Sequence, residues 1–188
     1  MSTAIQAQAP PPQWLPADNG YQVANADPAL IAGATILVAG TLYLVKLKAR
    51  SAAIALSAVR FSINAAGVGA STGSFGGLYS SAGQLLSGSA DAGALLLGTG
   101  DLNIPLSSPG QQIPAGGFAW AALLVNLATT QPTMNRLTGS VSTGANMGLT
   151  AATLAYAVNG TVLSSLPASI TPGANSAAGA IALWGGGS

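Results

Sequence analysis

The sequence has no cysteine and no histidine, and its four acidic residues are all aspartate. Without cysteine the chain has no disulfide, no thiolate zinc site and no thiol nucleophile. Without histidine it lacks the usual general base, which excludes a Ser-His-Asp triad within one chain. Charged residues are only 5% of the 188 residues, against about a quarter in an ordinary soluble domain. These absences predict a protein that is not an enzyme and uses no cofactor.

The few charges that remain nearly cancel, since the formal net charge is +1. A chain with so weak a field does not attract nucleic acid, and we expect no nucleic-acid partner. Hydrophobic residues are 49% of the chain, and 25 residues are glycine. An uncharged surface of small residues lacks the usual protection against association. We therefore expect a homo-oligomer whose surface is largely covered by copies or partners.

One uncharged run, Pro28–Val45, has the length of a membrane span, and Lys46, Lys48 and Arg50 follow it. Its content favours two strands instead. Gly40 interrupts the run, and the residues of Thr41–Leu47 alternate between two faces, with Leu42, Leu44 and Lys46 on one of them. We predict two short strands separated at Ala39-Gly40 and no membrane span.

Residues 1–16 (MSTAIQAQAPPPQWLP) have the composition of an extended arm. Pro10, Pro11 and Pro12 favour polyproline II and cannot join a sheet ladder. Trp14 and Leu15 supply bulky apolar side chains. The arm is either a disordered leader or a docking strap whose Trp14 binds a neighbour, because tryptophan is a frequent interface anchor.

The rest of the chain, residues 17–188, is predicted to be one all-β domain, a sandwich with jelly-roll-like architecture. Short apolar segments alternate with linkers rich in Gly, Ser, Pro and Asn. The predicted strands are Ala34–Val38, Thr41–Leu47, Ala53–Asn64, Gly73–Tyr79, Gln84–Ser87, Leu102–Leu106, Phe118–Leu127, Thr153–Val158 and Ala180–Trp184. Ala90–Leu97 fits one helical turn, which Gly93 weakens.

Several segments resemble structural proteins of bacteriophages. GLYSSAGQLLSGS (Gly77–Ser89) and LNIPLSSPGQQIPAGGFAWAALLVNL (Leu102–Leu127) resemble a jelly-roll module of virion proteins. LPADNGYQ (Leu15–Gln22), DPALIAGATILVAGTLYLVKL (Asp27–Leu47) and PASITPGANSAAGAIALWGG (Pro167–Gly186) are similar to small structural proteins in phages of actinobacteria. The resemblance implies a virion location, homo-oligomers that are often trimers, and in some members recognition of host surface glycans.

Within that resemblance two roles compete. One is a tail-fibre or tail-tip protein that contacts the host, for which we expect exposed ligand contacts at Tyr79, Asn103 and Gln111. The other is a capsid decoration or head-fibre protein, which the strap around Trp14 suits. A secreted carbohydrate-binding module is the alternative from another class, and it requires an exposed aromatic strip.

Four of the five basic residues lie within fifteen positions: Lys46, Lys48, Arg50 and Arg60. The first three share one face of a strand, and Arg60 adjoins them if Ala49–Ser51 turns a hairpin. The set is either a solvated face that protects an edge or a basic patch. As a basic patch it binds an acidic neighbouring protein or an anionic cell-wall polymer.

Two acidic residues, Asp91 and Asp101, flank a glycine-containing stretch. Two carboxylates can contribute to a calcium site or support glycoside hydrolysis. The segment lacks an EF-hand pattern, so the preferred interpretation is a pair of turn residues.

The aromatic residues Phe118, Trp120 and Tyr156 fit either a sugar-stacking platform or the sandwich core, and the core is preferred. Tyr21 and Tyr79, each beside turn residues, are predicted to be nearer the surface. Trp184 is predicted to pin the last strand to the core or to another subunit.

Overall fold

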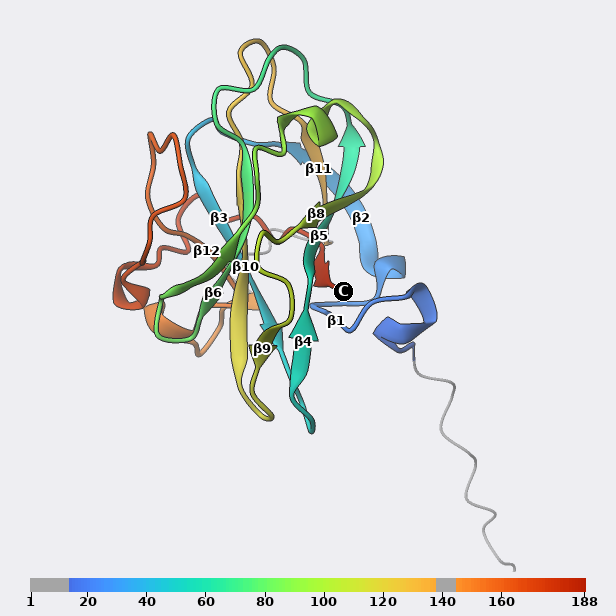
Figure 1. Ribbon diagram of the computed structural model, residues 1–188, viewed down its shortest axis with the longest axis vertical. Helices are drawn as coiled ribbons and strands as arrows, with labels where there is room; N and C mark the ends of the chain where they lie inside the picture. The colour runs from blue at the N-terminus through green and yellow to red at the C-terminus, as the bar shows by residue number, and fades with distance from the viewer. Residues whose placement is uncertain (1–13, 138–144) are drawn as a thin grey trace, which may run out of the picture.

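The computed structural model describes residues 14–137 and 145–188, which form antiparallel sheets with few helices (Figure 1). The prediction of an all-β protein is confirmed. Pro10, Pro11 and Pro12 lie outside the described residues. No helix in the described part of the chain is long and apolar enough to cross a membrane.

Three sheets are present in these residues. Sheet A consists of β1 (Val23–Ala24), β2 (Ile31–Ile36), β5 (Ala58–Ala65), β8 (Gly100–Pro105), β11 (Thr133–Leu137) and β13 (Gly185–Gly187). Sheet B consists of β3 (Leu42–Lys48), β6 (Phe75–Ser80), β7 (Leu85–Gly88), β10 (Phe118–Leu124) and β12 (Tyr156–Val158). A small third sheet pairs β4 (Ile54–Leu56) with β9 (Gln111–Ile113).

Short 3-10 helices occupy some of the connections. They are η1 (Pro16–Asn19), η2 (Pro28–Leu30), η3 (Gly93–Leu97), η4 (Ala151–Thr153) and η5 (Pro172–Ala174). The helical turn predicted in Ala90–Leu97 is η3. Two residues before η3, the Asp91 carboxylate accepts a hydrogen bond from the Gly93 amide at 2.7 Å.

In sheet A, the long strand β5 pairs along one edge with β8 and along the other with β13 and then β11. β1 pairs with β13, and β2 pairs with β11. In sheet B the order is β12-β3-β10-β6-β7. Every pairing is antiparallel, so short turns and crossovers between the two sheets are enough to connect the strands.

Side chains of sheet B alternate between two apolar clusters, as the period of two in a strand requires. Tyr43, Val45 and Leu47 point from β3 into a core shared with Val59 and Phe61 of sheet A. This sheet-to-sheet core confirms the alternation that we predicted for Thr41–Leu47.

The opposite face of sheet B is also buried. Leu42 and Leu44 of β3 and Trp120 of β10 form a second cluster there. Irregular chain from the C-terminal part covers it, contributing Leu154 and Ile170. The architecture is therefore sheet A, sheet B and a covering layer of irregular chain.

The strands predicted at Gly73–Tyr79 and Gln84–Ser87 are confirmed as β6 and β7, which pair as a hairpin. Gly83 has φ of +87° at the turn, a conformation that favours glycine, and its amide donates to the Ser80 carbonyl at 2.9 Å. The strand pair predicted within Pro28–Val45 is confirmed as β2 and β3.

Other strand predictions need correction. Ala53–Asn64 is two strands, β4 and β5, which belong to different sheets. β1, β9 and β11 were not predicted, because they are short or carry polar residues. The last strand is the glycine run β13 rather than Ala180–Trp184. A Cβ on Gly187 would lie 2.7 Å from the fully buried Leu56 side chain, which would have to shift to admit it, so glycine suits this close approach.

Candidate binding cleft

A cleft of about 540 Å³ lies between the segment that opens the described chain and the connection from β3 to β4. This size is within the range of about 300–1,000 Å³ typical of small-molecule sites. The cleft brings together two sets of candidate binding residues that the sequence analysis treated separately, one from the arm and one from the basic patch. Its walls include Trp14, Leu15, Asn25, Asp27, Lys48 and Arg50.

The first wall begins with local hydrogen bonds. The Trp14 indole N–H donates to the Asn19 side-chain oxygen at 2.7 Å, and the Leu15 amide donates to the Asp18 carboxylate at 2.9 Å. Gly20, with φ of +75°, ends η1 and turns the chain towards β1. Trp14 is half-buried, while Leu15 is exposed.

Two side chains attach this wall to the body of the protein. Asn25 donates to the Tyr156 hydroxyl at 3.0 Å and to the Leu183 carbonyl at 2.8 Å, and it accepts from the Gly185 amide at 3.0 Å. The indole N–H of Trp184 donates to the Ala26 carbonyl at 2.9 Å. Trp184 therefore pins the end of the chain to the core, one of its two predicted roles.

The opposite wall carries the positive charge. Lys48 ends β3, and Arg50 follows in the connection to β4. Both are exposed, and within the described residues neither side chain forms an ion pair or hydrogen bond. Across the cleft, the Asp27 carboxylate already accepts the Ala29 amide at 2.8 Å. The cleft can therefore receive an anionic group between two unpaired cations and an indole.

The predicted basic patch of four residues is divided. Lys46, Lys48 and Arg50 come from one strand and its end, but Lys46 is half-buried over the outer cluster. Its ammonium donates to the Thr153 carbonyl and lies 5.1 Å from the centre of the Phe118 ring. Burial, and next the Lys48 charge, lowers the pKa of Lys46.

Arg60 is not part of the patch, because it lies on β5 in the other sheet. Its guanidinium pairs with Asp101 and also donates to the Ser188 hydroxyl at 3.0 Å. It lies 5.4 Å from the centre of the Tyr21 ring. The condition for Arg60 to adjoin the other three basic residues, a hairpin at Ala49–Ser51, is not met, since β4 of the third sheet follows β3 and β5 lies in sheet A.

Tyr21 is half-buried between this ion pair and Trp184, with 5.1 Å between the two ring centres. Burial raises the pKa of Tyr21, the Asp101 charge raises it further, and the Arg60 charge opposes both. These contacts connect the start of the described chain to β5 and β8 and serve the fold.

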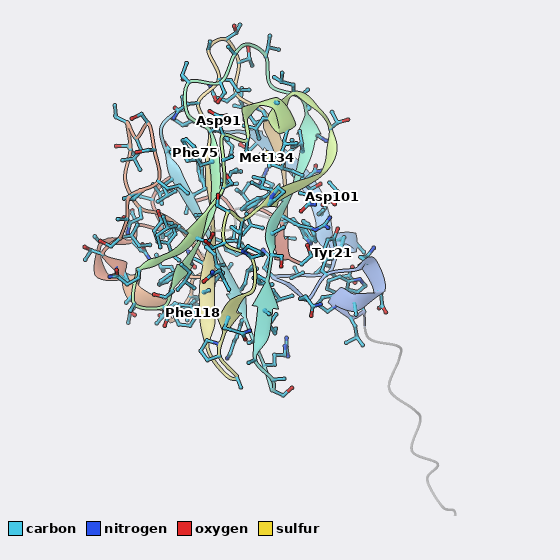
Figure 2. All side chains as sticks on the ribbon, viewed as in Figure 1. Tyr21, Phe75, Asp91, Asp101, Phe118 and Met134 are labelled. Carbon is cyan, nitrogen blue, oxygen red and sulfur yellow. The ribbon has the colours of Figure 1, made fainter. Side chains whose placement is uncertain are left out.

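Asp91 and Asp101 do not form one site. Figure 2 shows Asp101 near Tyr21 and Asp91 at a different place on the molecule. Asp91 accepts hydrogen bonds from the Ser71 hydroxyl and the Gly93 amide, at 2.9 and 2.7 Å. Among the residues described, no group of three potential carboxylate, imidazole or thiolate ligands gathers around one point. The structure therefore supports the interpretation of Asp91 as a turn residue.

The aromatic side chains are mostly buried. Trp120 and Tyr79 are fully buried, and Tyr156 is 5% exposed. Tyr79 was predicted to be a surface ligand contact, which is wrong. It lies on the covered face of sheet B, where its hydroxyl donates to the Pro167 carbonyl at 2.8 Å. The preferred prediction of a core role for Trp120 is confirmed, and Phe118 packs edge-on against it.

The two polar residues predicted as ligand contacts lie on separate sheets. Asn103 is exposed on β8, opposite Arg60 in the ladder. Gln111 is half-buried on β9 and donates to the Ser108 carbonyl at 3.0 Å. Neither lines the cleft. Asn25, which positions the cleft, was not predicted, because its segment carried only a turn signal.

Comparison with known proteins gives no further assignment: no family model, no curated protein sequence and no solved structure matches the chain.

Proposed function

We propose that this chain is a non-enzymatic structural protein of a bacteriophage virion, which binds a neighbouring component or a host polymer through the cleft. Most of its ionisable side chains serve the fold. Asp18, Asp27 and Asp91 bind backbone amides, Asp101 pairs with Arg60, and Lys46 binds a carbonyl. This is the observation that carries the proposal, because Lys48 and Arg50 are left for binding while Asp27, the carboxylate in the cleft wall, already accepts a backbone amide.

The finer proposal is a jelly-roll-like trimer in the tail fibre or tail tip. It rests on the resemblance and on the low charge of the chain. A capsid decoration protein is the second candidate. The observation that favours it is the position of Trp14 and Leu15, two residues of the arm that line the cleft.

A carbohydrate-binding module is less well supported. Stacking on a sugar ring requires an exposed aromatic face, whereas Tyr79, Trp120 and Tyr156 are buried. Host glycans remain a proposed ligand through charge rather than through an aromatic strip.

The experiment is immunogold electron microscopy of phage particles that encode this chain, with an antibody raised against residues 14–188. Gold at the tail end supports the tail proposal, and gold over the head supports decoration. The matched control is the same preparation labelled with pre-immune antibody. Unlabelled particles, together with abundant free protein, would overturn the virion proposal.

The role of the cleft is tested in the same system with Lys48→Glu/Arg50→Glu. Both side chains are exposed, so the variant is expected to fold and to lose binding to the anionic partner. Arg136 does not line the cleft, so Arg136→Gln serves as the control for lost positive charge. Equal incorporation of both variants into particles, with equal adsorption to host cells, would contradict the role of the cleft.

A further inference from the structure

Strand β1 presents main-chain hydrogen-bonding groups on the side away from β13. A Cβ on Gly186 would lie 2.9 Å from the Val23 carbonyl oxygen, and the Asn25 amide donates to the Gly185 carbonyl at 3.0 Å. The Val23 carbonyl and the Asn25 amide therefore both point towards β13. The described peptide bonds are all trans, and in a planar trans peptide the C=O and N–H groups point in opposite directions. The N–H and C=O of Ala24 consequently both point away from β13.

No strand in the described part of the chain pairs with Ala24 on that side. β1 is the end strand of sheet A beyond β13, and Ala24 itself lines the cleft. An extended peptide can add to such an edge by bonding to the outward N–H and C=O groups. Because β1 has only two residues, the rest of the cleft must supply most of the recognition.

The two cations of the cleft are spaced to share one carboxylate. Lys48 and Arg50 are exposed and flank Ala49, which is fully buried. Residues two apart in an extended chain are about 7 Å from each other and point to the same side. One carboxylate can therefore lie between the ammonium and the guanidinium. Asp27 does not fill this role, because its carboxylate holds the Ala29 amide and forms no ion pair with either cation.

The rest of the cleft is mainly apolar. More than half of its lining residues have apolar side chains, and these include Trp14, Leu15 and Ile54. Leu15 is 56% exposed, so a bound apolar group would remove it from water, which is favourable. A polymer with a phosphate in every repeat would place charges against this apolar wall, where the loss of hydration is costly. A peptide can combine one acidic side chain with apolar ones.

From these features we infer that the cleft binds an extended, acidic peptide segment of a neighbouring protein. The main chain of the peptide pairs with Ala24, and its carboxylate lies between Lys48 and Arg50. Its apolar side chains contact the wall around Trp14. Residues 1–13 of the chain itself contain no aspartate or glutamate, so they lack the acidic side chain that suits the two cations. The inference rests on the binding role proposed for the cleft, and it selects a protein partner over a host polymer.

The test starts from the full-length chain and a yeast-displayed library of short random peptides. We expect the selected peptides to share an aspartate or glutamate with apolar residues at alternate positions. Synthetic copies are then titrated by fluorescence anisotropy with the wild type, with Lys48→Glu/Arg50→Glu and with the control Arg136→Gln. We expect the cleft variant to bind at least about tenfold more weakly, since a charge-assisted contact is lost, and the control to bind as the wild type does.

Three results would overturn the inference. The first is a selection that yields no acidic peptide. The second is equal affinity of an acidic peptide for the wild type and for Lys48→Glu/Arg50→Glu. The third is binding of a glycerol phosphate polymer in the same assay without binding of any peptide, which would assign the cleft to a host polymer instead.

The pairing with Ala24 is tested without changing the protein. The selected peptide is N-methylated at one residue at a time. Methylation of the amide that donates to the Ala24 carbonyl should weaken binding by about fivefold, since one hydrogen bond is lost, whereas methylation of the two neighbouring amides, which point away from β1, should have little effect. Equal affinity of all the methylated peptides would overturn the strand pairing.

The peptide experiments and the immunogold experiment can fail separately. Peptide binding is measured on the purified chain and does not depend on particles. Unlabelled particles together with bound acidic peptide would overturn the virion proposal and leave this inference standing. Labelled particles without peptide binding would do the reverse.

Discussion

The two faces of sheet B are equally buried but are covered in different ways. On the inner face, Tyr43, Val45 and Leu123 pack against side chains of sheet A. On the outer face, Trp120, Tyr79 and Leu124 are covered by irregular chain that includes Leu154 and Ile170. The first is contact between two regular layers, and the second is contact between a sheet and a coil.

The coil differs from a sheet because many of its backbone carbonyls have no ladder partner, and burial without a partner is costly. Side chains of sheet B, and Asn126 just after the end of β10, supply the partners. The Trp120 indole donates to Leu154 at 3.2 Å, the Tyr79 hydroxyl to Pro167 at 2.8 Å and the Asn126 amide to Leu163 at 2.8 Å. The outer face of sheet B therefore depends on a few side-chain hydrogen bonds as well as on buried apolar area.

The strongest test of this contrast is Trp120→Ala. It removes a fully buried side chain and leaves the Leu154 carbonyl without its donor. We expect the free energy of unfolding to fall by about 3–5 kcal/mol, and we expect the covering layer to detach. Urea unfolding measures the first effect, and limited thermolysin digestion with mass spectrometry measures cleavage in residues 145–175.

Leu123→Ala is the matched control from the inner face of the same strand. It should also cost about 2–5 kcal/mol but should not expose the covering layer before global unfolding. Identical cleavage patterns for the two variants would show that the two faces are not separately held.

Asn126→Ala is expected to have the next largest effect. The Asn126 amide bridges the Gly73 and Leu163 carbonyls, at 3.0 and 2.8 Å. Loss of both bonds should reduce the free energy of unfolding by about 1–3 kcal/mol. Hydrogen exchange should quicken at the Leu163 amide, which donates to Gly40. Asn64→Ala, at an exposed position of β5, is the control, and equal exchange in both variants would contradict the bridge.

Much of this fold follows from the alternation in single strands. The pattern of Thr41–Leu47 predicts both faces of β3, and that of Phe118–Leu123 separates Phe118 and Trp120 from the inward-facing alanines. Tyr79 was predicted to be near the surface, but it is buried. The alternation along a strand shows that its side chains point to two faces, and it does not show that irregular chain covers the outer face of sheet B. Leu154, Leu163 and Ile170 have no regular spacing, so their contact with sheet B has no local signal.

The cleft was predictable only in parts. Trp14 and the pair Lys48 and Arg50 each stand out in the sequence. Their positions around one cleft depend on the pairing of β1 with β13. The sequence does not predict that pairing, because a strand of three glycines carries no hydrophobic pattern. The separation of Arg60 from Lys46 could not be predicted either. The sequence indicates which segments are strands but not which strands share a sheet, and β3 and β5 lie in different sheets.

High pH provides a milder test. Burial raises the pKa of Tyr79 on the outer face, and it also raises that of Tyr43 on the inner face, where the Val38 hydrogen bond opposes the rise. The unfolded chain loses these protons near pH 10 while the folded chain retains them, so stability is complete below pH 10 and falls as pH rises. A tyrosine that stays protonated in the folded chain while it is ionised in the unfolded chain contributes a slope of at most about 1.4 kcal/mol per pH unit.

The measurement is urea unfolding between about pH 9 and 11, near the ordinary tyrosine pKa. Tyr79→Phe should flatten the decline more than Tyr43→Phe, because its hydroxyl is a donor only in the protonated form. An equal decline in the wild type and in Tyr79→Phe would contradict a buried, protonated Tyr79.

The smallest expected effect is a gain in stability within the covering layer. Val162 is 93% exposed and has φ of +58°, a left-handed conformation that is unfavourable for a β-branched residue. Val162→Gly should relieve this strain and lose almost no contact, with a net gain of up to about 1 kcal/mol after the added freedom of the unfolded chain. Val162→Ala, which keeps a Cβ, should gain less, and thermal unfolding of the three proteins under identical conditions measures the order. If Val162→Gly is the least stable of the three proteins, the Val162 side chain stabilises the covering layer more than its exposure indicates. Packing, and not only hydrogen bonds, would then hold this part of the covering layer on the outer face of sheet B.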